Sequence, residues 1–271
     1  MFLENLKKKR ILILLIFIFF ITGCVKKIKK RLQDKPVVTY IEKPAELLLQ
    51  DANKYLRQQN YSLAAQTFEE IDKQHPYSNV AKKSKIIAAY SYYMNKEYSD
   101  SIFAIDRFIS LHPADRSLMP YVIYLKGLCY FDRIDNVDLD QEPSQNTKKI
   151  FEELIKKFPN SVYSKDAKKK IIIANDQIAA KEMDIGRYYQ EKNRHLAAIE
   201  RFKVVVNDYN TTAQTPEALY RLTESYLSLG IITEAKKTTA VLSYNFKESN
   251  WYKLSYDLFK KYGYKKNGKK G

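Results

Sequence analysis

The sequence predicts an all-α protein in which pairs of helices repeat along the chain. The segment NYSLAAQTFEEIDKQHP at residues 60–76 recurs as EYSDSIFAIDRFISLHP at residues 97–113, an offset of 37 residues. A repeat period in the thirties is typical of stacked helical hairpins. The chain of 271 residues contains only 7 glycines and 8 prolines, which argues against a β-sandwich and against an enzyme built on glycine-rich loops.

The repeat has five copies, and each keeps small and large residues in register. In the second helix of each copy the pattern comprises Ala64, Phe68 and Ile71; Ser101, Ile105 and Phe108; Thr147, Phe151 and Leu154; Ala198, Phe202 and Val205; and Ala235, Thr239 and Leu242. In the first helix a small residue precedes a tyrosine by three positions, in the pairs Ala52 and Tyr55, Ala89 and Tyr92, Gly127 and Tyr130, Gly186 and Tyr189, and Thr223 and Tyr226. Antiparallel helices pack closely where a small side chain faces a large one.

This spacing resembles the tetratricopeptide repeat. We therefore predict a tetratricopeptide-repeat α-solenoid of five helix pairs over residues 44–247. Pro76, Pro113 and Pro159 follow the second helix of the first three copies, and we expect them to set the turn because proline cannot continue a helix. Copies four and five lack this proline, so we expect their helices to end less sharply. The alternative, an ordinary helical bundle with coincidental similarity, is disfavoured by the five copies.

A closing helix and a basic tail are expected at residues 248–271. In that helix Trp251, Leu254 and Leu258 share one face, consistent with covering the last repeat. The ten repeat helices are expected near residues 44–59, 61–74, 79–95, 98–111, 117–133, 144–157, 162–192, 195–209, 215–229 and 232–245. The seventh contains no proline and is long enough to bridge two halves of the array.

The start of the chain predicts a bacterial lipoprotein. Basic residues precede an apolar run at residues 11–21, and Thr22, Gly23 and Cys24 follow. This order is typical of a secretory signal peptide, and its end resembles a lipobox. We expect a signal peptide at residues 1–23, cleavage after Gly23, a lipid on Cys24 and a lipidated tether at residues 24–43. The residue after the cysteine is valine rather than aspartate, which favours the outer membrane; the alternative is an uncleaved signal anchor.

Composition excludes several other classes of function. The formal net charge is +16, but the lysines are interleaved with glutamates and form no basic–aromatic cluster typical of nucleic-acid binding. His75, His112 and His195 lie far apart, so we expect no metal site, and Cys129 lies in an apolar stretch typical of a buried residue. No catalytic motif is present, so we expect an adaptor without a cofactor rather than an enzyme.

An acidic insertion, DRIDNVDLDQEPSQN at residues 132–146, interrupts the third copy. Its carboxylates do not follow the order of a calcium-binding EF-hand loop. A long loop in a compact array is typical of a functional or a disordered segment, and we favour a function.

Four segments resemble the BamD family, the outer-membrane protein assembly lipoproteins of the β-barrel assembly machine. They are AIDRFISLHP at 104–113, YVIYLKGLCYF at 121–131, DQEPSQNTKKIFEELIKKFPNSVYSKDA at 140–167 and RYYQEKNRHLAAIERFKVVVNDYNTT at 187–212. The third segment includes part of the insertion, which generic helical repeats would not share. The resemblance covers essentially residues 24–245.

The resemblance implies a lipoprotein on the periplasmic face of the outer membrane. Its implied partners are the POTRA domains of BamA, unfolded outer-membrane proteins and accessory Bam lipoproteins. The family's substrate-facing arginine falls on Arg107, and an aromatic substrate-binding position falls on His75, a departure that weakens that contact. The arginine that faces BamA falls on Arg201. Alternatives are a periplasmic tetratricopeptide-repeat lipoprotein regulating a cell-wall synthase, and a tethered enzyme with an unrecognised active site.

Lipidation can be tested directly at the proposed cleavage site. Mass spectrometry of the mature N-terminus should find an acylated Cys24, because the thiol must accept the lipid before the peptidase cuts. Cys24→Ser should therefore accumulate an uncleaved precursor. An unmodified cysteine, or a mature chain that starts elsewhere, would end the lipoprotein interpretation.

Overall fold

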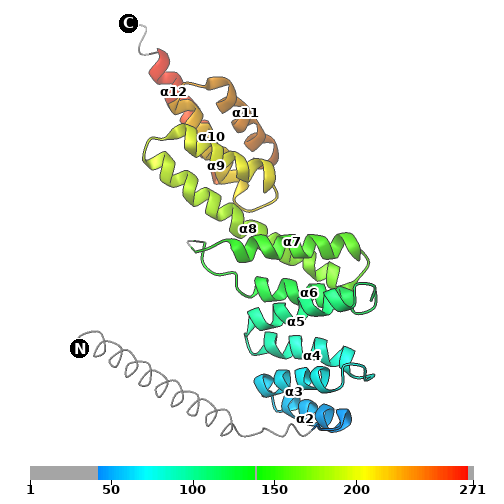
Figure 1. Ribbon diagram of the computed structural model, residues 1–271. Helices are drawn as coiled ribbons and strands as arrows, with labels where there is room; N and C mark the ends of the chain where they lie inside the picture. The colour runs from blue at the N-terminus through cyan, green and yellow to red at the C-terminus, as the bar shows by residue number, and fades with distance from the viewer. Residues whose placement is uncertain (1–41, 138, 268–271) are drawn as a thin grey trace, which may run out of the picture. The chain divides into compact units, whose positions relative to one another are not determined.

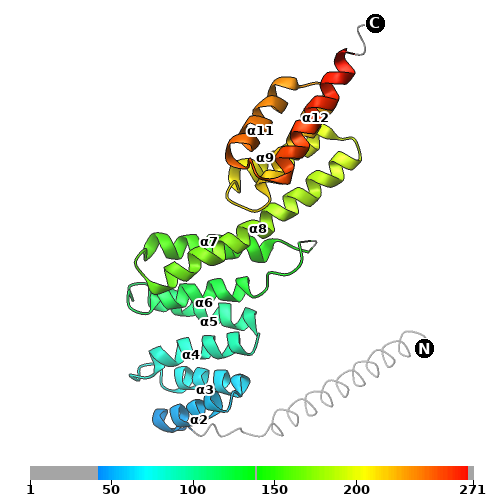
Figure 2. The same cartoon turned by 180° about the vertical axis from the view of Figure 1, so that it is seen from behind.

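The computed structural model of the protein describes residues 42–137 and 139–267, shown from two sides in Figures 1 and 2. These residues form eleven α-helices and no strand, which confirms the predicted fold class. With the labels of Figure 1, the helices are α2 (Ala45–Arg57), α3 (Tyr61–Gln74), α4 (Ala81–Met94), α5 (Tyr98–Leu111), α6 (Met119–Phe131), α7 (Glu142–Lys157), α8 (Val162–Glu191), α9 (His195–Asp208), α10 (Thr215–Ser228), α11 (Ile232–Asn245) and α12 (Asn250–Asn267).

The helices pair in chain order. Each of α2 to α11 packs against the helix that follows it, and α12 lies against both α10 and α11. The 30-residue helix α8 contacts α6 and α7 and also α9 and α10, so it joins the third pair to the fourth as its uninterrupted sequence predicts.

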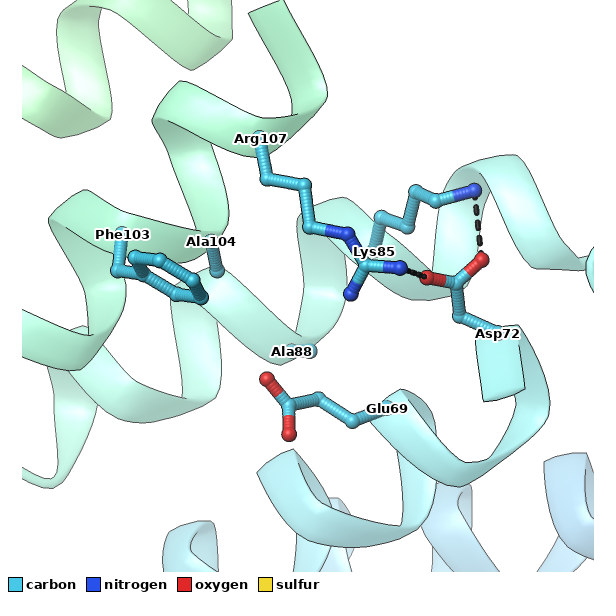
Figure 3. Close-up of a pocket in the computed structure, with 7 residues that line it drawn as sticks. All are labelled: Glu69, Asp72, Lys85, Ala88, Phe103, Ala104 and Arg107. Atoms are coloured by element: carbon cyan, nitrogen blue, oxygen red, sulfur yellow. Dashed lines mark ion pairs between the residues drawn. The ribbon is translucent and has the colours of Figure 1, made fainter. Parts of the chain in front are cut away.

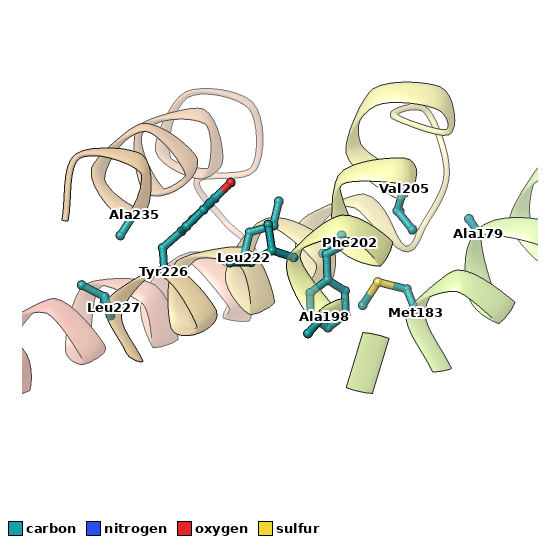
Figure 4. Packing of buried hydrophobic residues seen from close by; sticks show 11 residues of the cluster. Ala179, Met183, Ala198, Phe202, Val205, Leu222, Tyr226, Leu227 and Ala235 are labelled. Carbon is teal, nitrogen blue, oxygen red and sulfur yellow. The ribbon is translucent and has the colours of Figure 1, made fainter. Parts of the chain in front are cut away.

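In the third and fourth pairs, a glycine of one helix faces a phenylalanine of the next. A Cβ atom at Gly127 of α6 would overlap the Phe151 ring of α7, and one at Gly186 of α8 would overlap the Phe202 ring of α9. Both rings are completely buried. Figure 4 shows Phe202 among Ala198, Met183 and Leu222, so a single ring contacts α8 and lies beside α10. The predicted small-to-large packing is confirmed at both positions.

The tip between the two helices of a pair has a common backbone geometry. Four repeats place a residue with positive φ there: Gln59, Lys96, Asn193 and Gly230. The next amide donates a hydrogen bond of 2.8–2.9 Å back to a tyrosine carbonyl of the first helix, and these tyrosines are Tyr55, Tyr92, Tyr189 and Tyr226. This is the Schellman ending of a helix. In the third repeat the acidic insertion takes its place.

The turn between successive repeats corrects our expectation about proline. All five second helices end on a ring-bearing residue with φ between −131° and −137°: His75, His112, Phe158, Tyr209 and Phe246. The carbonyl of each accepts a hydrogen bond from the amide three residues later. The fourth and fifth repeats therefore end as sharply as the first three, because hydrogen bonds rather than proline define the turn.

The closing helix is present, but its predicted contact face was partly wrong. Leu254 is 45% exposed, whereas Ser255 is buried. Leu258, Phe259 and Tyr262 pack on the core cluster of the last two repeats, and the Trp251 ring lies 5.4 Å from that of Tyr220. With 3.6 residues per turn, this face passes through Ser255 and leaves Leu254 beside it.

The glycine–phenylalanine contact makes a quantitative prediction. Gly127→Ala should destabilise the fold by about 1–3 kcal/mol, the usual cost of overfilling a packed core. Phe151→Leu should relieve the overlap, so the double variant should lose less stability than the sum of the two single changes. Urea unfolding of the variants measures both effects.

The matched control replaces the equivalent ring of the fourth repeat. Gly127→Ala combined with Phe202→Leu should be additive, because these residues belong to different helix pairs. Wild-type stability of Gly127→Ala would show that the α6–α7 crossing tolerates a wider separation.

Candidate functional site

A small hollow lies over α4, between α3 and α5, and is drawn in Figure 3. Helical spacing builds it, because residues three or four apart share one face of their helix. The lining residues are Glu69 and Asp72 of α3, Lys85 and Ala88 of α4, and Phe103, Ala104 and Arg107 of α5. Arg107, for which we predict substrate binding, is among the residues that line this hollow.

Asp72 stands between two cations at the wall of this hollow. Its side chain is only 4% exposed, with Oδ1 2.7 Å from Lys85 Nζ and Oδ2 2.8 Å from Arg107 Nη2. The Arg107 contact lacks the angular alignment of a hydrogen bond, so it is an ion pair. A buried carboxylate is tolerated when cations compensate its lost hydration. One negative charge shared by two positive charges leaves the three side chains with a net charge of +1.

The Arg107 side chain remains 49% exposed despite its ion pair. Phe103, one helical turn earlier, is 70% exposed and lies at the same hollow (Figure 3). Glu69 forms a hydrogen bond with Tyr92. The pKa of Tyr92 is raised first by burial and then by the negative charge and the hydrogen bond of Glu69. The hollow thus offers guanidinium donors next to an accessible aromatic ring, which suits a peptide that carries an acceptor oxygen and an apolar side chain.

The structure does not bring His75 into this hollow. His75 ends α3 one turn after Asp72 and occupies the ring position shared by the turns that follow all five second helices. Its counterpart His112 packs against Phe108 with ring centroids 4.8 Å apart and ring planes tilted by 49°. The pKa of His112 is lowered first by burial and then by the positive charges of Lys85 and Lys82. The shared position has a structural role, and substrate binding by His75 stays a prediction.

A second hollow, which the sequence did not reveal, has a volume of about 430 Å³. Its walls come from α5, α6 and α7, with Ile109, Met119, Ile123 and Phe158 supplying apolar surface. At its rim Asp115 pairs with Lys82 and Glu153 pairs with Lys157 at 2.6 Å, whereas Arg116 is exposed and pairs with no described residue. No sequence pattern distinguishes Arg116, because its exposure depends on the turn before α6.

Arg201 lies on α9 with its side chain 43% exposed, so it faces partly outward as predicted. It also has an intrachain partner that the sequence did not indicate: its Nη1 lies 3.1 Å from Glu182 Oε2 on α8. Farther along α8, Arg187 pairs with Glu217 of α10 at 3.1 Å, and Arg221 pairs with Glu217 at 3.3 Å. Charged side chains therefore link α8 to both helices that follow it.

Three further observations concern metal ligands, membrane spans and Cys129. Within residues 42–137 and 139–267, no three histidine, cysteine or acidic side chains gather as a metal site would require. Over the same residues no helix is both long and apolar enough to cross a membrane. Cys129 is buried, and burial raises the pKa of its thiol to about 11. Gly23 and Cys24 lie outside the described residues.

The five helix pairs and their shared turns define a helical-repeat protein of the tetratricopeptide type. Residues 41–242 match the YfiO family of outer membrane lipoproteins, and the chain belongs to this family. Curated relatives named outer membrane protein assembly factor BamD extend the likeness. The protein from Caulobacter vibrioides is 42% identical over 88% of this chain and 76% of its own length. The protein from Rickettsia prowazekii is 41% identical over 81% of this chain and 87% of its own length.

The ion group in the first hollow predicts an order of stability changes. Asp72→Asn should destabilise the fold by roughly 3–5 kcal/mol, because the largely buried Lys85 then loses the carboxylate that compensates its charge. Arg107→Gln should cost less than about 1 kcal/mol, since Asp72 keeps Lys85 and the guanidinium is half exposed. Chemical denaturation of the two variants gives the comparison; equal losses would mean that Arg107 is as structural as Asp72.

Proposed function

We propose that this protein is an outer-membrane protein assembly factor, an adaptor subunit of the β-barrel assembly complex. Family membership over residues 41–242 supports the proposal most directly. The helical-repeat architecture agrees with it, since such arrays present extended surfaces to partners. The signal peptide at residues 1–23 and the lipid on Cys24 would place the repeats of residues 44–247 at the periplasmic face of the outer membrane, beyond a tether at residues 24–43.

We further propose that the hollow beside Arg107 receives a segment of an unfolded outer-membrane protein. Arg107 has donor groups beyond the one that meets Asp72, and exposed Phe103 supplies an apolar contact. The half-exposed guanidinium of Arg107 favours an acceptor oxygen or a carboxylate on the peptide. His75, outside the hollow, would contact only a peptide that continues past the end of α3.

Arg201 is the proposed contact to BamA. A half-exposed guanidinium can form two parallel hydrogen bonds with a partner carboxylate, which a lysine cannot. Glu182 holds it in place within the chain, so the partner would meet a pre-positioned donor rather than a mobile one. Accessory Bam lipoproteins are further candidate partners.

The runner-up function is regulation of a cell-wall synthase by a periplasmic repeat lipoprotein. The two functions require different partners but the same kind of scaffold. Purification of the tagged protein from detergent-solubilised envelope distinguishes them, because one predicts recovery of BamA and the other recovery of a peptidoglycan synthase. Recovery of a synthase without BamA would reject the assembly role.

The role of Arg201 can be separated from its intrachain ion pair. Arg201→Glu should strongly reduce recovery of BamA, since loss of one partner in a buried interfacial ion pair costs about 2–5 kcal/mol. The double variant Arg201→Glu with Glu182→Arg restores the intrachain attraction and should still bind BamA poorly. Recovery of BamA and thermal unfolding are measured for both.

The matched control is Lys236→Glu, the same charge change at an exposed position of α11 that has no ion pair with a described residue. It should leave BamA recovery near wild type. Full recovery with the double variant would show that Arg201 acts only through Glu182, as a structural residue.

A further inference from the structure

Helix α12 lies beyond residues 41–242, where the family match ends, and it has two distinct sides. One side faces the last two repeats: Leu258, Phe259 and Tyr262 pack on their core, and Ser255 is buried. This contact fixes which residues point outward. The residues on the outward side of α12 therefore have a fixed orientation relative to the last two repeats.

The outward side combines lysines with large apolar groups. In order around the helix it comprises Tyr256, Lys260, Lys253, Asp257, Lys261 and Leu254, all exposed. Tyr256 is 53% exposed and Leu254 is 45% exposed, one at each edge of the lysine stripe. The Lys260 ammonium lies 4.6 Å from the centre of the Tyr256 ring. We call these six residues the α12 outer face.

The positive charge of the α12 outer face is not neutralised by its surroundings. None of Lys253, Lys260 and Lys261 has an ion pair with a described residue, although ion pairs are frequent elsewhere in the fold. Residues 250–271 contain seven lysines, one aspartate and no arginine. The charge thus increases along the sequence toward the C-terminus.

We propose that the α12 outer face binds an anionic lipid surface. Lysine stems can lie along apolar groups while their ammonium ends reach headgroup phosphates. Tyrosine suits the boundary between headgroups and acyl chains, and leucine can enter it. Lysines that cluster on one face are attracted to the negative potential of a surface that contains anionic lipids. The proposal does not depend on a role in outer-membrane protein assembly.

An acidic protein is the competing ligand, and the residue types disfavour it. Arginine suits the recognition of protein carboxylates because its planar guanidinium can form two parallel hydrogen bonds. The basic residues of the α12 outer face are all lysines. Lysine attracts a phosphate surface as a point charge without requiring one fixed orientation. The apolar residues stand at the edges of the stripe and not at its centre, whereas protein interfaces place their apolar anchors centrally.

The test uses the full chain in vesicles and a single tryptophan as reporter. Trp251 is the only tryptophan, so Trp251→Phe with Tyr256→Trp moves the reporter to the α12 outer face. Vesicles are made from brominated phosphatidylcholine, which quenches tryptophan on contact, with or without phosphatidylglycerol. Quenching should be strong with phosphatidylglycerol and weak without it, and added salt should reverse it.

In the same reporter chain, Lys253→Glu, Lys260→Glu and Lys261→Glu together should lower the ratio of docked to undocked helix by about a hundredfold or more, since each lysine near an anionic surface contributes roughly fivefold. The control changes Lys165, Lys168 and Lys169 of α8 to glutamate, an equal charge change at exposed positions. Equal quenching in neutral vesicles, or an equal loss with the control, would overturn the proposal. So would absent lipid quenching together with a spectral shift on adding poly-glutamate, the result expected for an acidic protein ligand.

Discussion

In the third and fourth repeats, the close contact between a glycine and a buried phenylalanine ring governs the geometry of the helix pair. Gly127 against Phe151, and Gly186 against Phe202, set how near the two helices of a pair can lie. The ring then also contributes to packing against the next helix, as Phe202 does beside α10 (Figure 4). A change in one contact is therefore transmitted to its neighbour, which is why stability in such arrays resides in interfaces between adjacent units.

The packing of successive helices also positions polar groups. Helices held at a fixed separation let Asp72 reach cations on two other helices, and let Arg201 reach Glu182. In both places an arginine is anchored by a carboxylate while keeping part of its guanidinium accessible. Anchoring lowers the entropy lost when a partner binds, so exposed arginines on rigid helices are better recognition groups than arginines on loops.

The sequence predicted the fold well because the small and large positions are local and periodic. It did not correctly predict how sharply the fourth and fifth repeats end. Prolines can be recognised in the sequence, but the backbone hydrogen bonds that define all five turns cannot. Leu254 was misplaced because the closing helix has apolar residues on more than one face. The site was predicted only in part: Arg107 was found by resemblance, but its pairing with Asp72 and Lys85 requires three helices to meet, and Arg116 has no sequence signal at all.

The residues with positive φ at the tips of the helical hairpins indicate where the chain can accept insertions. Gln59, Lys96 and Asn193 hold a conformation that favours glycine, so these short tips carry backbone strain. The third repeat has a longer connection at the equivalent point, yet Gly127 and Phe151 on either side keep their contact. Hairpin tips are thus the places where new segments can be inserted during evolution without disturbing the register of the stack, and the acidic insertion is an instance already accommodated.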